Sequence, residues 1–193
     1  MRITGGRARG IPLRAPRGDA TRPATDRMRE AVFSSLAATV ENTRVLDLYA
    51  GSGAYGLEAL SRGARQVRFC ESNPQALACL RRNLDEVSRS CGQAVGETEI
   101  LPCRVEALAP APVCPDLIFL DPPYHTANDA LQEVFSTHLH RLAGPRSRIL
   151  LELPGHLEPD FHGWHLLRRI GKAGREKPTV AVFERTDFRR PVE

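Results

Sequence analysis

The sequence predicts an α/β fold, in which helices cover both faces of a mostly parallel sheet. From residue 43 onward, short apolar runs of strand length alternate with longer amphipathic stretches. This alternation is typical of parallel sheets in α/β proteins. A glycine-rich turn, Gly51-Ser52-Gly53, follows the first of these runs. With 193 residues, of which 41% are hydrophobic and 26% charged, the chain has the size and composition of one globular domain.

The N-terminal residues have a different composition from the rest. Residues 1–25 are rich in Gly, Arg and Pro and contain only short apolar pieces, which predicts a small basic hairpin or extended arm. Residues 26–193 then form the main domain. Thr25 or Asp26 is suited to cap a first helix at residues 27–40. Its apolar face contains Met28, Val32, Phe33 and Leu36.

The remaining elements follow from the lengths and periods of the apolar runs. Parallel strands are predicted at residues 45–48, 66–70, 99–103, 116–120 and 149–153. Helices are predicted at residues 55–62, 74–87 and 127–142. Pro74 lies in the first turn of the second of these helices, where its missing N–H is not needed. Residues 164–169 and 179–185 are predicted to form a final antiparallel pair.

Positive charge is concentrated near the N-terminus. The net charge is +4, and the first 30 residues hold eight arginines against three acidic residues. Guanidinium groups suit phosphate contacts, which favours nucleic acid as a partner. Alternatively, the arginine excess reflects genome composition and leaves only a solvated face. The candidate contacts with nucleic acid are Arg2, Arg7, Arg9, Arg22, Arg27 and Arg29.

Several other classes of protein are disfavoured. No apolar run has the length of a membrane span, and the N-terminus lacks the apolar core of a signal peptide. We therefore expect a cytoplasmic protein that does not associate with membranes. The five cysteines are odd in number and form no CxxC pair, so we expect neither a metal site nor a disulfide framework.

The glycine-rich turn predicts a cofactor site at the end of the first strand. Glycine allows the backbone to approach a bound group, and open α/β sheets bind ligands beyond the carboxyl ends of their strands. Asp47 lies at the end of that strand and can accept a hydrogen bond from a cationic amino group. Glu71 ends the second strand, where a carboxylate can bind the hydroxyls of a ribose. The candidate cofactor residues are Asp47, Ala50, Gly51, Ser52, Gly53, Glu71, Ser72 and Val105.

Two cofactors are compatible with this turn. Residues 51–56 match the G-x-G-x-x-G pattern of dinucleotide sites. However, the negative charge of Asp47 is unfavourable beside a pyrophosphate and favourable beside the amino group of a zwitterionic cofactor. The sequence therefore favours S-adenosylmethionine over NAD.

The tetrapeptide Asp121-Pro122-Pro123-Tyr124 follows the apolar run of the fourth parallel strand. Proline fixes φ and lacks an N–H, so the Pro122 carbonyl is presented rigidly. This carbonyl and the Asp121 carboxylate can accept the two protons of a base amine and leave its lone pair free. Tyr124 supplies a stacking face for a flipped base. These residues predict methyl transfer to a nucleobase amine, although a simple turn after a buried strand is an alternative interpretation.

Taken together, these segments resemble those of the bacterial 16S rRNA guanine-N2 methyltransferases. Besides the glycine turn and the Asp121–Tyr124 tetrapeptide, the resemblance depends on Arg2–Gly6 and on the segment Arg22-Pro23-Ala24-Thr25-Asp26-Arg27-Met28-Arg29-Glu30. It implies a Rossmann-like class I methyltransferase with seven strands, the last antiparallel. It also implies S-adenosylmethionine as the methyl donor and one guanine of 16S rRNA as the acceptor.

The resemblance further implies a role for each group of residues. Asp121, Pro122, Pro123 and Tyr124 would position guanine N2, and residues 1–25 would contact RNA. The expected partner is 16S rRNA within a 30S subunit or assembly intermediate, and we expect a monomer. Many relatives carry Asp or Asn after the third strand to bind adenine, where this chain has Arg104-Val105-Glu106. An adenine-N6 methyltransferase acting on RNA or DNA, and a non-catalytic RNA-binding protein, remain alternatives.

Overall fold

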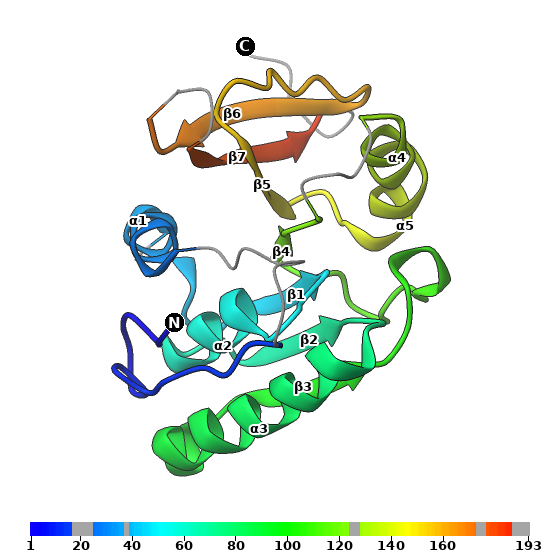
Figure 1. Ribbon diagram of the computed structural model, residues 1–193. Helices are drawn as coiled ribbons and strands as arrows, with labels where there is room; N and C mark the ends of the chain where they lie inside the picture. The colour runs from blue at the N-terminus through cyan, green and yellow to red at the C-terminus, as the bar shows by residue number, and fades with distance from the viewer. Residues whose placement is uncertain (17–24, 37–38, 124–127, 173–176, 187–193) are drawn as a thin grey trace.

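A computed structural model describes residues 1–16, 25–36, 39–123, 128–172 and 177–186. These residues form a seven-stranded sheet with the order β3-β2-β1-β4-β5-β7-β6 (Figure 1). β7 is antiparallel to both β5 and β6, and the other neighbouring strands are parallel. The strands are β1 (Arg44–Leu48), β2 (Gln66–Cys70), β3 (Glu97–Leu101), β4 (Leu117–Leu120), β5 (Arg148–Pro154), β6 (Trp164–Ile170) and β7 (Pro178–Arg185). The expected Rossmann-like fold is confirmed.

Helices cover both faces of the sheet, as the alternating pattern predicted. Side chains from one face of the strands, such as Val45 and Phe119, join a core with α1, α2 and α3. Side chains from the other face, such as Leu46 and Ile118, join a second core with η4 and α5. The helical segments are α1 (Asp26–Leu36), α2 (Ala54–Ser61), α3 (Pro74–Cys91), η2 (Gly92–Ala94), η3 (Val105–Ala107), α4 (Asn128–Glu133), η4 (Val134–Leu139) and α5 (His140–Leu142).

The helix predicted at residues 127–142 contains a π-helical stretch, η4, between α4 and α5. A widened turn leaves main-chain carbonyls without their usual partners. Here the indole N–H of Trp164 donates to the carbonyl of Phe135 at 3.1 Å. The Phe135 ring also stacks on Phe161, with 3.7 Å between the ring centroids. These tertiary contacts stabilise the π stretch, and a search for a 3.6-residue period could not predict it.

Other predicted boundaries differ from the structure by a few residues. β3 begins at Glu97 rather than at residue 99, because polar residues of this edge strand pair with β2: Arg68 contacts Glu99 at 2.6 Å. α3 continues to Cys91, where the side chain is buried like that of Val87. The first helix is described over Asp26–Leu36, residues 37–38 lie outside the described residues, and Val40, the predicted end, is not helical. Its cap is the Thr25 hydroxyl, which accepts from the Met28 N–H at 3.2 Å.

The N-terminal residues form a hairpin that lies against α2 (Figure 1). Within it, the Ile3 N–H donates to the Ile11 carbonyl at 2.9 Å. The carboxylate of Glu58, a fully buried residue of α2, accepts hydrogen bonds of 2.8 Å from Thr4 N–H, the Thr4 hydroxyl and Gly5 N–H. A Cβ at Gly6 would lie 2.1 Å from the Ser61 carbonyl oxygen, so glycine is needed for this close approach. The hairpin is therefore anchored to the domain.

Among the helices in the described part of the chain, none combines the length and the apolar character that crossing a membrane requires.

Candidate active site

The predicted cofactor turn connects β1 to α2 at the carboxyl edge of the sheet. Strand order reverses between β1 and β4, and this is where open α/β sheets bind ligands. The turn needs glycine for two different reasons. Gly51 has φ +57° and faces open space, since a Cβ there would have only the Tyr49 carbonyl oxygen nearby, at 3.9 Å. Gly53 has φ +86°, and a Cβ there would lie 2.3 Å from the Leu80 side chain.

Asp47, near the end of β1 just before this turn, is unusual for an acidic residue because it is only 1% exposed. It accepts a hydrogen bond of 2.9 Å from the Gly56 N–H. A Cβ at Gly56 would lie 3.0 Å from Asp47 Oδ2 and 2.3 Å from Phe69, so only glycine allows this contact. No arginine, lysine or histidine in the described part of the chain forms an ion pair with Asp47.

Burial raises the pKa of Asp47 to about 8; the negative charge of Glu71 adds to this rise and the Gly56 hydrogen bond opposes it. A buried carboxyl with such a pKa takes up a proton unless a cation approaches it. The cationic amino group of an aminoacyl cofactor is such a cation, so this site fits S-adenosylmethionine.

Glu71 is held by main-chain N–H groups beside the same turn. Its Oε2 accepts from Gly51 N–H at 2.8 Å. Its Oε1 accepts from Ser72 N–H at 2.8 Å and from Asn73 N–H at 2.7 Å. A carboxylate oxygen has more than one acceptor position, and the side chain is half-buried, so hydroxyl groups can still approach it. Ala50 and Ser52 are buried in the turn between Asp47 and α2.

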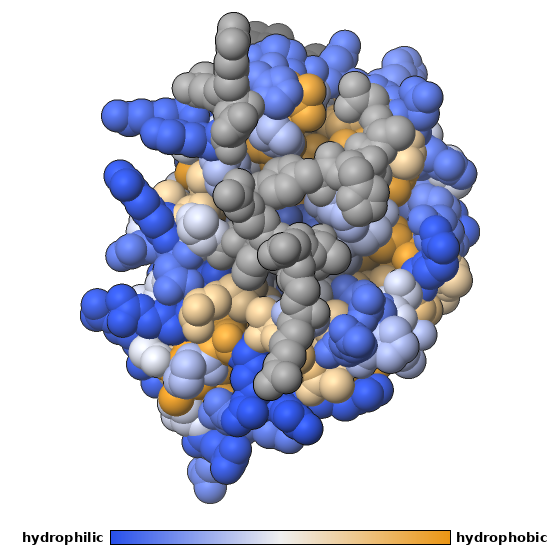
Figure 2. All heavy atoms as spheres, viewed as in Figure 1, coloured by the Kyte–Doolittle hydropathy of each residue, from blue (hydrophilic) through white to orange (hydrophobic). Residues whose placement is uncertain are grey.

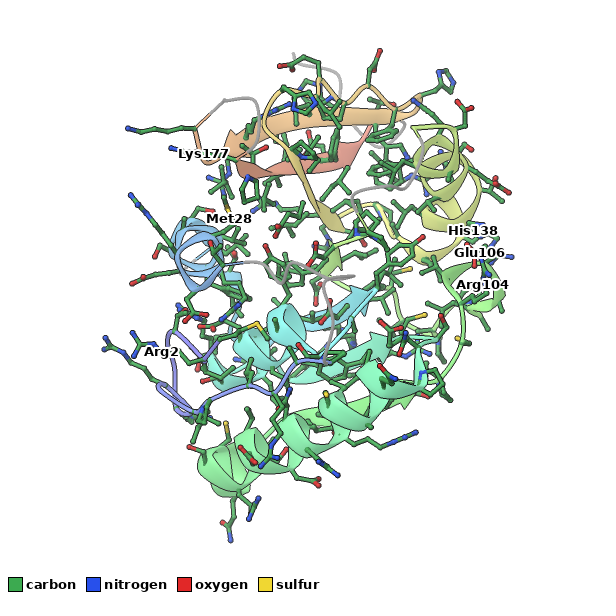
Figure 3. All side chains as sticks on the ribbon, in the orientation of Figure 1. Arg2, Met28, Arg104, Glu106, His138 and Lys177 are labelled. Atoms are coloured by element: carbon green, nitrogen blue, oxygen red, sulfur yellow. The ribbon has the colours of Figure 1, made fainter. Side chains whose placement is uncertain are left out.

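The third part of the predicted cofactor site follows β3. Val105 is buried in η3, whereas Arg104 and Glu106 are exposed and form an ion pair of 3.2 Å. Figure 3 shows these two residues beside His138 of η4. Glu106 also affects Tyr49: burial, together with the negative charge of Glu106, raises the pKa of Tyr49 to about 12. The Tyr49 hydroxyl therefore stays neutral at physiological pH.

Asp121 and Pro122 lie directly after β4, next to the cofactor turn. Pro122 is buried and Pro123 is exposed, while Tyr124 lies outside the described residues. Burial raises the pKa of Asp121 well above its ordinary value, the charges of Glu152 and Asp47 raise it further, and Arg29 opposes these effects. The predicted acceptor residue is therefore next to carboxylates from two other strands.

One of these carboxylates, Glu152, was missed in the sequence. It lies in β5, is 3% exposed, and accepts a hydrogen bond of 2.7 Å from the Tyr55 hydroxyl. A signal was present: the run Ile149-Leu150-Leu151-Glu152-Leu153 places one carboxylate inside a buried strand. Ionisable residues are rarely fully buried without a specific partner.

The candidate RNA contacts divide into two groups. Arg2, Arg7, Arg9 and Arg27 are exposed, and Arg22 lies outside the described residues. Hydrophilic side chains project along the left margin of Figure 2, where the hairpin and α1 lie in Figure 1. Between the hairpin and α1 there is a cavity of about 140 Å³, lined by Arg2, Ile3, Thr4, Arg9, Gly10, Asp26 and Glu30.

The inclusion of Arg29 among the RNA contacts was wrong. Its side chain has no exposed surface. The guanidinium donates to Asp26 at 2.8 Å and to the Arg2 carbonyl, and Arg29 Nε lies 3.9 Å from a Glu58 carboxylate oxygen. The sequence pattern could not distinguish this buried arginine from the exposed Arg27, because both lie in the same polar segment.

The family model described as Conserved hypothetical protein 95 matches residues 1–180. The chain belongs to this family. Ribosomal RNA small subunit methyltransferase D of Escherichia coli (strain K12) is 36% identical over 124 residues, which are 64% of this chain and 60% of that protein. YlbH of Bacillus subtilis (strain 168) is 35% identical over 124 residues, 64% of this chain and 67% of YlbH. The match thus spans about two thirds or less of these relatives.

A solved structure of this family's fold covers nearly the whole chain. The yhhF protein of Escherichia coli is 30% identical, with a TM-score of 0.76, and the alignment covers 96% of this chain and 97% of that one. The resemblance to the 16S rRNA methyltransferase family and the class I methyltransferase fold are confirmed. S-adenosylmethionine is the cofactor that this family and fold indicate.

Proposed function

We propose that this chain is an S-adenosylmethionine-dependent methyltransferase that modifies the exocyclic N2 amine of one guanine in 16S rRNA. The observation that carries the proposal is the approach of two carboxyls, the buried Asp47 and the half-buried Asp121, at the strand-order reversal. Asp47 suits a cationic group of the cofactor, and Asp121 suits the amine of a base. The name of the E. coli relative supports rRNA as the substrate.

The residues around the turn would hold the cofactor. Asp47 would accept hydrogen bonds from its amino group, and Glu71 would accept them from its ribose. Gly51 leaves space for the bound molecule, and Val105 would contribute to the adenine end. Ala50, Ser52, Gly53 and Ser72 complete the lining. When bound, S-adenosylmethionine supplies an electrophilic methyl group.

The residues after β4 would hold the acceptor. The N2 lone pair of guanine is delocalised into the ring, so the amine is a poor nucleophile. Asp121 and the Pro122 carbonyl would accept its two hydrogens and direct the lone pair toward the methyl group, and Tyr124 would stack on the base. Pro123 would keep this segment rigid. The proton lost from N2 would pass to the Asp121 carboxylate.

The exposed arginines Arg2, Arg7, Arg9 and Arg27, together with Arg22, would contact the RNA backbone. Phosphate contacts of this kind position the nucleic acid but do not identify a base. Recognition of one guanine then depends on the shape of the RNA, which favours a 30S subunit or assembly intermediate over free rRNA. This proposal places the protein in the cytoplasm, acting as a monomer.

The test combines labelled S-adenosylmethionine with purified protein and undermethylated 30S subunits, followed by nucleoside analysis of the 16S rRNA. We expect the label in N2-methylguanosine at one position, with Asp121→Ala inactive under the same conditions. Label in N6-methyladenosine would replace the guanine assignment with the adenine one. Binding of NADH without binding of S-adenosylmethionine would contradict the cofactor assignment.

A further inference from the structure

Glu152 lies beside Asp121 on the neighbouring strand. β4 and β5 are parallel, and their register pairs Leu120 with Leu151. The next residues along the two strands are therefore Asp121 and Glu152, with side chains on the same face of the sheet. This is the face that packs against α1 and α2, since Phe119 and Leu150 contribute to that core. The two carboxyls are therefore neighbours on one face of the sheet, and the charge of Glu152 raises the pKa of Asp121.

Tyr55 of α2 holds Glu152 from the other side. Its ring is 4% exposed and stacks on Phe119, with 5.0 Å between the ring centroids and 13° between the planes. Its hydroxyl donates to Glu152 Oε2 at 2.7 Å. The pKa of Tyr55 lies well above its ordinary value, mainly because of burial and then because of the charge of Glu152. The hydroxyl therefore keeps its proton and remains a donor.

Among the described groups around this pair, negative charges outnumber positive ones if every carboxyl is ionised. Asp47 of β1, Asp121 directly after β4 and Glu152 of β5 all approach from the sheet. From α2 come the neutral Tyr55 and the buried carboxylate of Glu58, which lies 3.9 Å from Arg29 Nε. From α1, the buried Arg29 contributes one positive charge that lowers the pKa of Asp121. Two adjacent carboxyls that are largely shielded from water rarely ionise together, because each charge raises the pKa of the other.

We propose that Asp121 and Glu152 share one proton, and that Glu152 in its neutral form is a positioning residue that orients Asp121 toward the guanine amine. This inference rests on the proposed function. Glu152 accepts from Tyr55 through one oxygen and donates its carboxyl O–H to one oxygen of Asp121. The second Asp121 oxygen then keeps the negative charge and accepts the N2 hydrogen.

The arrangement accounts for every proton and electron pair in the transfer. The N2 lone pair forms the new N–C bond, while the bond between the methyl carbon and sulfur breaks and leaves its electrons on sulfur. The proton lost from N2 moves to the charged oxygen of Asp121. Glu152 and Tyr55 keep their own protons, so the positive charge of the sulfonium and the negative charge of Asp121 disappear together.

Conservative variants distinguish this role from a purely structural one. Glu152→Gln keeps an acceptor for Tyr55 and an N–H donor for Asp121, so it imitates the neutral acid. We expect kcat for Glu152→Gln to stay within a few-fold of the wild-type value and kcat for Glu152→Ala to fall about 100-fold. Tyr55→Phe keeps the stacked ring and should lower kcat without changing KM for the cofactor. Glu99→Gln, an exposed carboxylate of β3, is the control.

The pH profile gives a second readout. Asp121 must be ionised to accept the amine, so activity falls on the acid side of its pKa. Because Glu152 is neutral in the proposed pair, glutamine at position 152 leaves the charge beside Asp121 unchanged, and the acid limb of kcat/KM should stay near its wild-type position. The proposal would be overturned if Glu152→Gln were as inactive as Glu152→Ala, or if its acid limb moved to clearly lower pH, which would show that Glu152 carries a charge in the wild-type protein.

Infrared spectroscopy of the free protein tests the shared proton without any substrate. The wild-type protein should show the carbonyl band of a protonated, buried carboxyl that is absent in Glu152→Gln, with Asp47→Asn identifying the separate band of Asp47. If Glu152→Gln lost no such band, the shared proton would be refuted. A protein that shows the band but does not methylate guanine would contradict the proposed function and not the carboxyl pair. Normal N2-methylguanosine formation by Glu152→Ala would contradict the positioning role of Glu152 and leave the proposed function intact.

Discussion

The buried carboxyl of Asp47 should make the cofactor-free protein less stable than its carboxamide variant, Asp47→Asn. The folded-state pKa of Asp47 is about 8, against an ordinary value of 3.8. At pH 7 the unfolded chain has an ionised Asp47, while the folded protein holds the proton. The cost is about 1.4 kcal/mol for each pH unit above 3.8, or about 4 kcal/mol at pH 7. The carboxamide of the variant would carry no such penalty and could still accept from Gly56.

The sign of the pH dependence follows from the raised pKa. Between pH 3.8 and about 8 the folded state binds more protons at this position than the unfolded state, so its stability falls as the pH rises. The difference between Asp47→Asn and the wild type should therefore be small near pH 4 and largest above pH 8. At pH 7 the melting temperature should rise by roughly 10 °C, since 1 kcal/mol corresponds to about 2–4 °C in a chain of this size.

Thermal and urea unfolding of both proteins between pH 4 and 9, without cofactor, measure this difference. Calorimetric binding of S-adenosylmethionine provides the complementary result. The cofactor's amino group should restore the ionised form of Asp47, so wild-type binding at pH 7 should release close to one proton, and Asp47→Asn should bind weakly and release none. If Asp47→Asn were less stable than the wild type at pH 7, the carboxylate would have a stabilising partner and the reasoning would be wrong.

Three further predictions concern other parts of the molecule. Asp121→Asn should lower kcat at least 100-fold while leaving the calorimetric affinity for S-adenosylmethionine unchanged, because the side chain acts on the acceptor; a parallel loss of affinity would place it in the cofactor site. Replacing Arg7 and Arg9 by Gln should weaken binding to 16S rRNA and reduce the slope of log K against log salt by about 0.7–0.9 per lost phosphate contact, and an unchanged slope would favour the solvated-face interpretation. Glu58→Gln should lower the free energy of unfolding in urea by about 3 kcal/mol, because it removes the buried charge that contacts Arg29 and the hairpin. Thr4→Val is the control: it removes only one hydroxyl hydrogen bond and should lower the free energy of unfolding by about 1 kcal/mol.

Local sequence patterns predicted the sheet because its strands are buried on both faces and read as short apolar runs. They were least accurate at β3, whose residues Glu97, Thr98 and Glu99 are exposed and are held by pairing with β2. The π-helical stretch from Val134 depends on the Trp164 side chain, which lies far away in the sequence. Contacts over such separations leave no periodic signal.

In the candidate site, too, local motifs were predictable and contacts between distant residues were not. Asp47 and Asp121 were predictable because Asp47 lies near the carboxyl end of β1, Asp121 directly follows β4, and both belong to recognisable motifs. Glu152 belongs to no motif, and its role depends on a strand register and on a hydroxyl from α2. Arg29 was misassigned because charge composition describes where arginines occur in the chain and does not show which of them are buried.

Arg29 also connects the N-terminal hairpin to the proposed acceptor site. Its guanidinium is fixed by the Arg2 carbonyl of the hairpin, by Asp26 and by the nearby Glu58, and its charge opposes the rise in the pKa of Asp121. Because the group is fully buried, little solvent screens this interaction. A movement of the hairpin on contact with RNA would change the position of Arg29, and with it the fraction of Asp121 that is ionised. RNA binding by the hairpin is therefore expected to be coupled to the charge state of Asp121. Arg2 is the hairpin residue that contacts both Arg29 and Asp26, so a substitution at Arg2 should change the pH profile of methyl transfer.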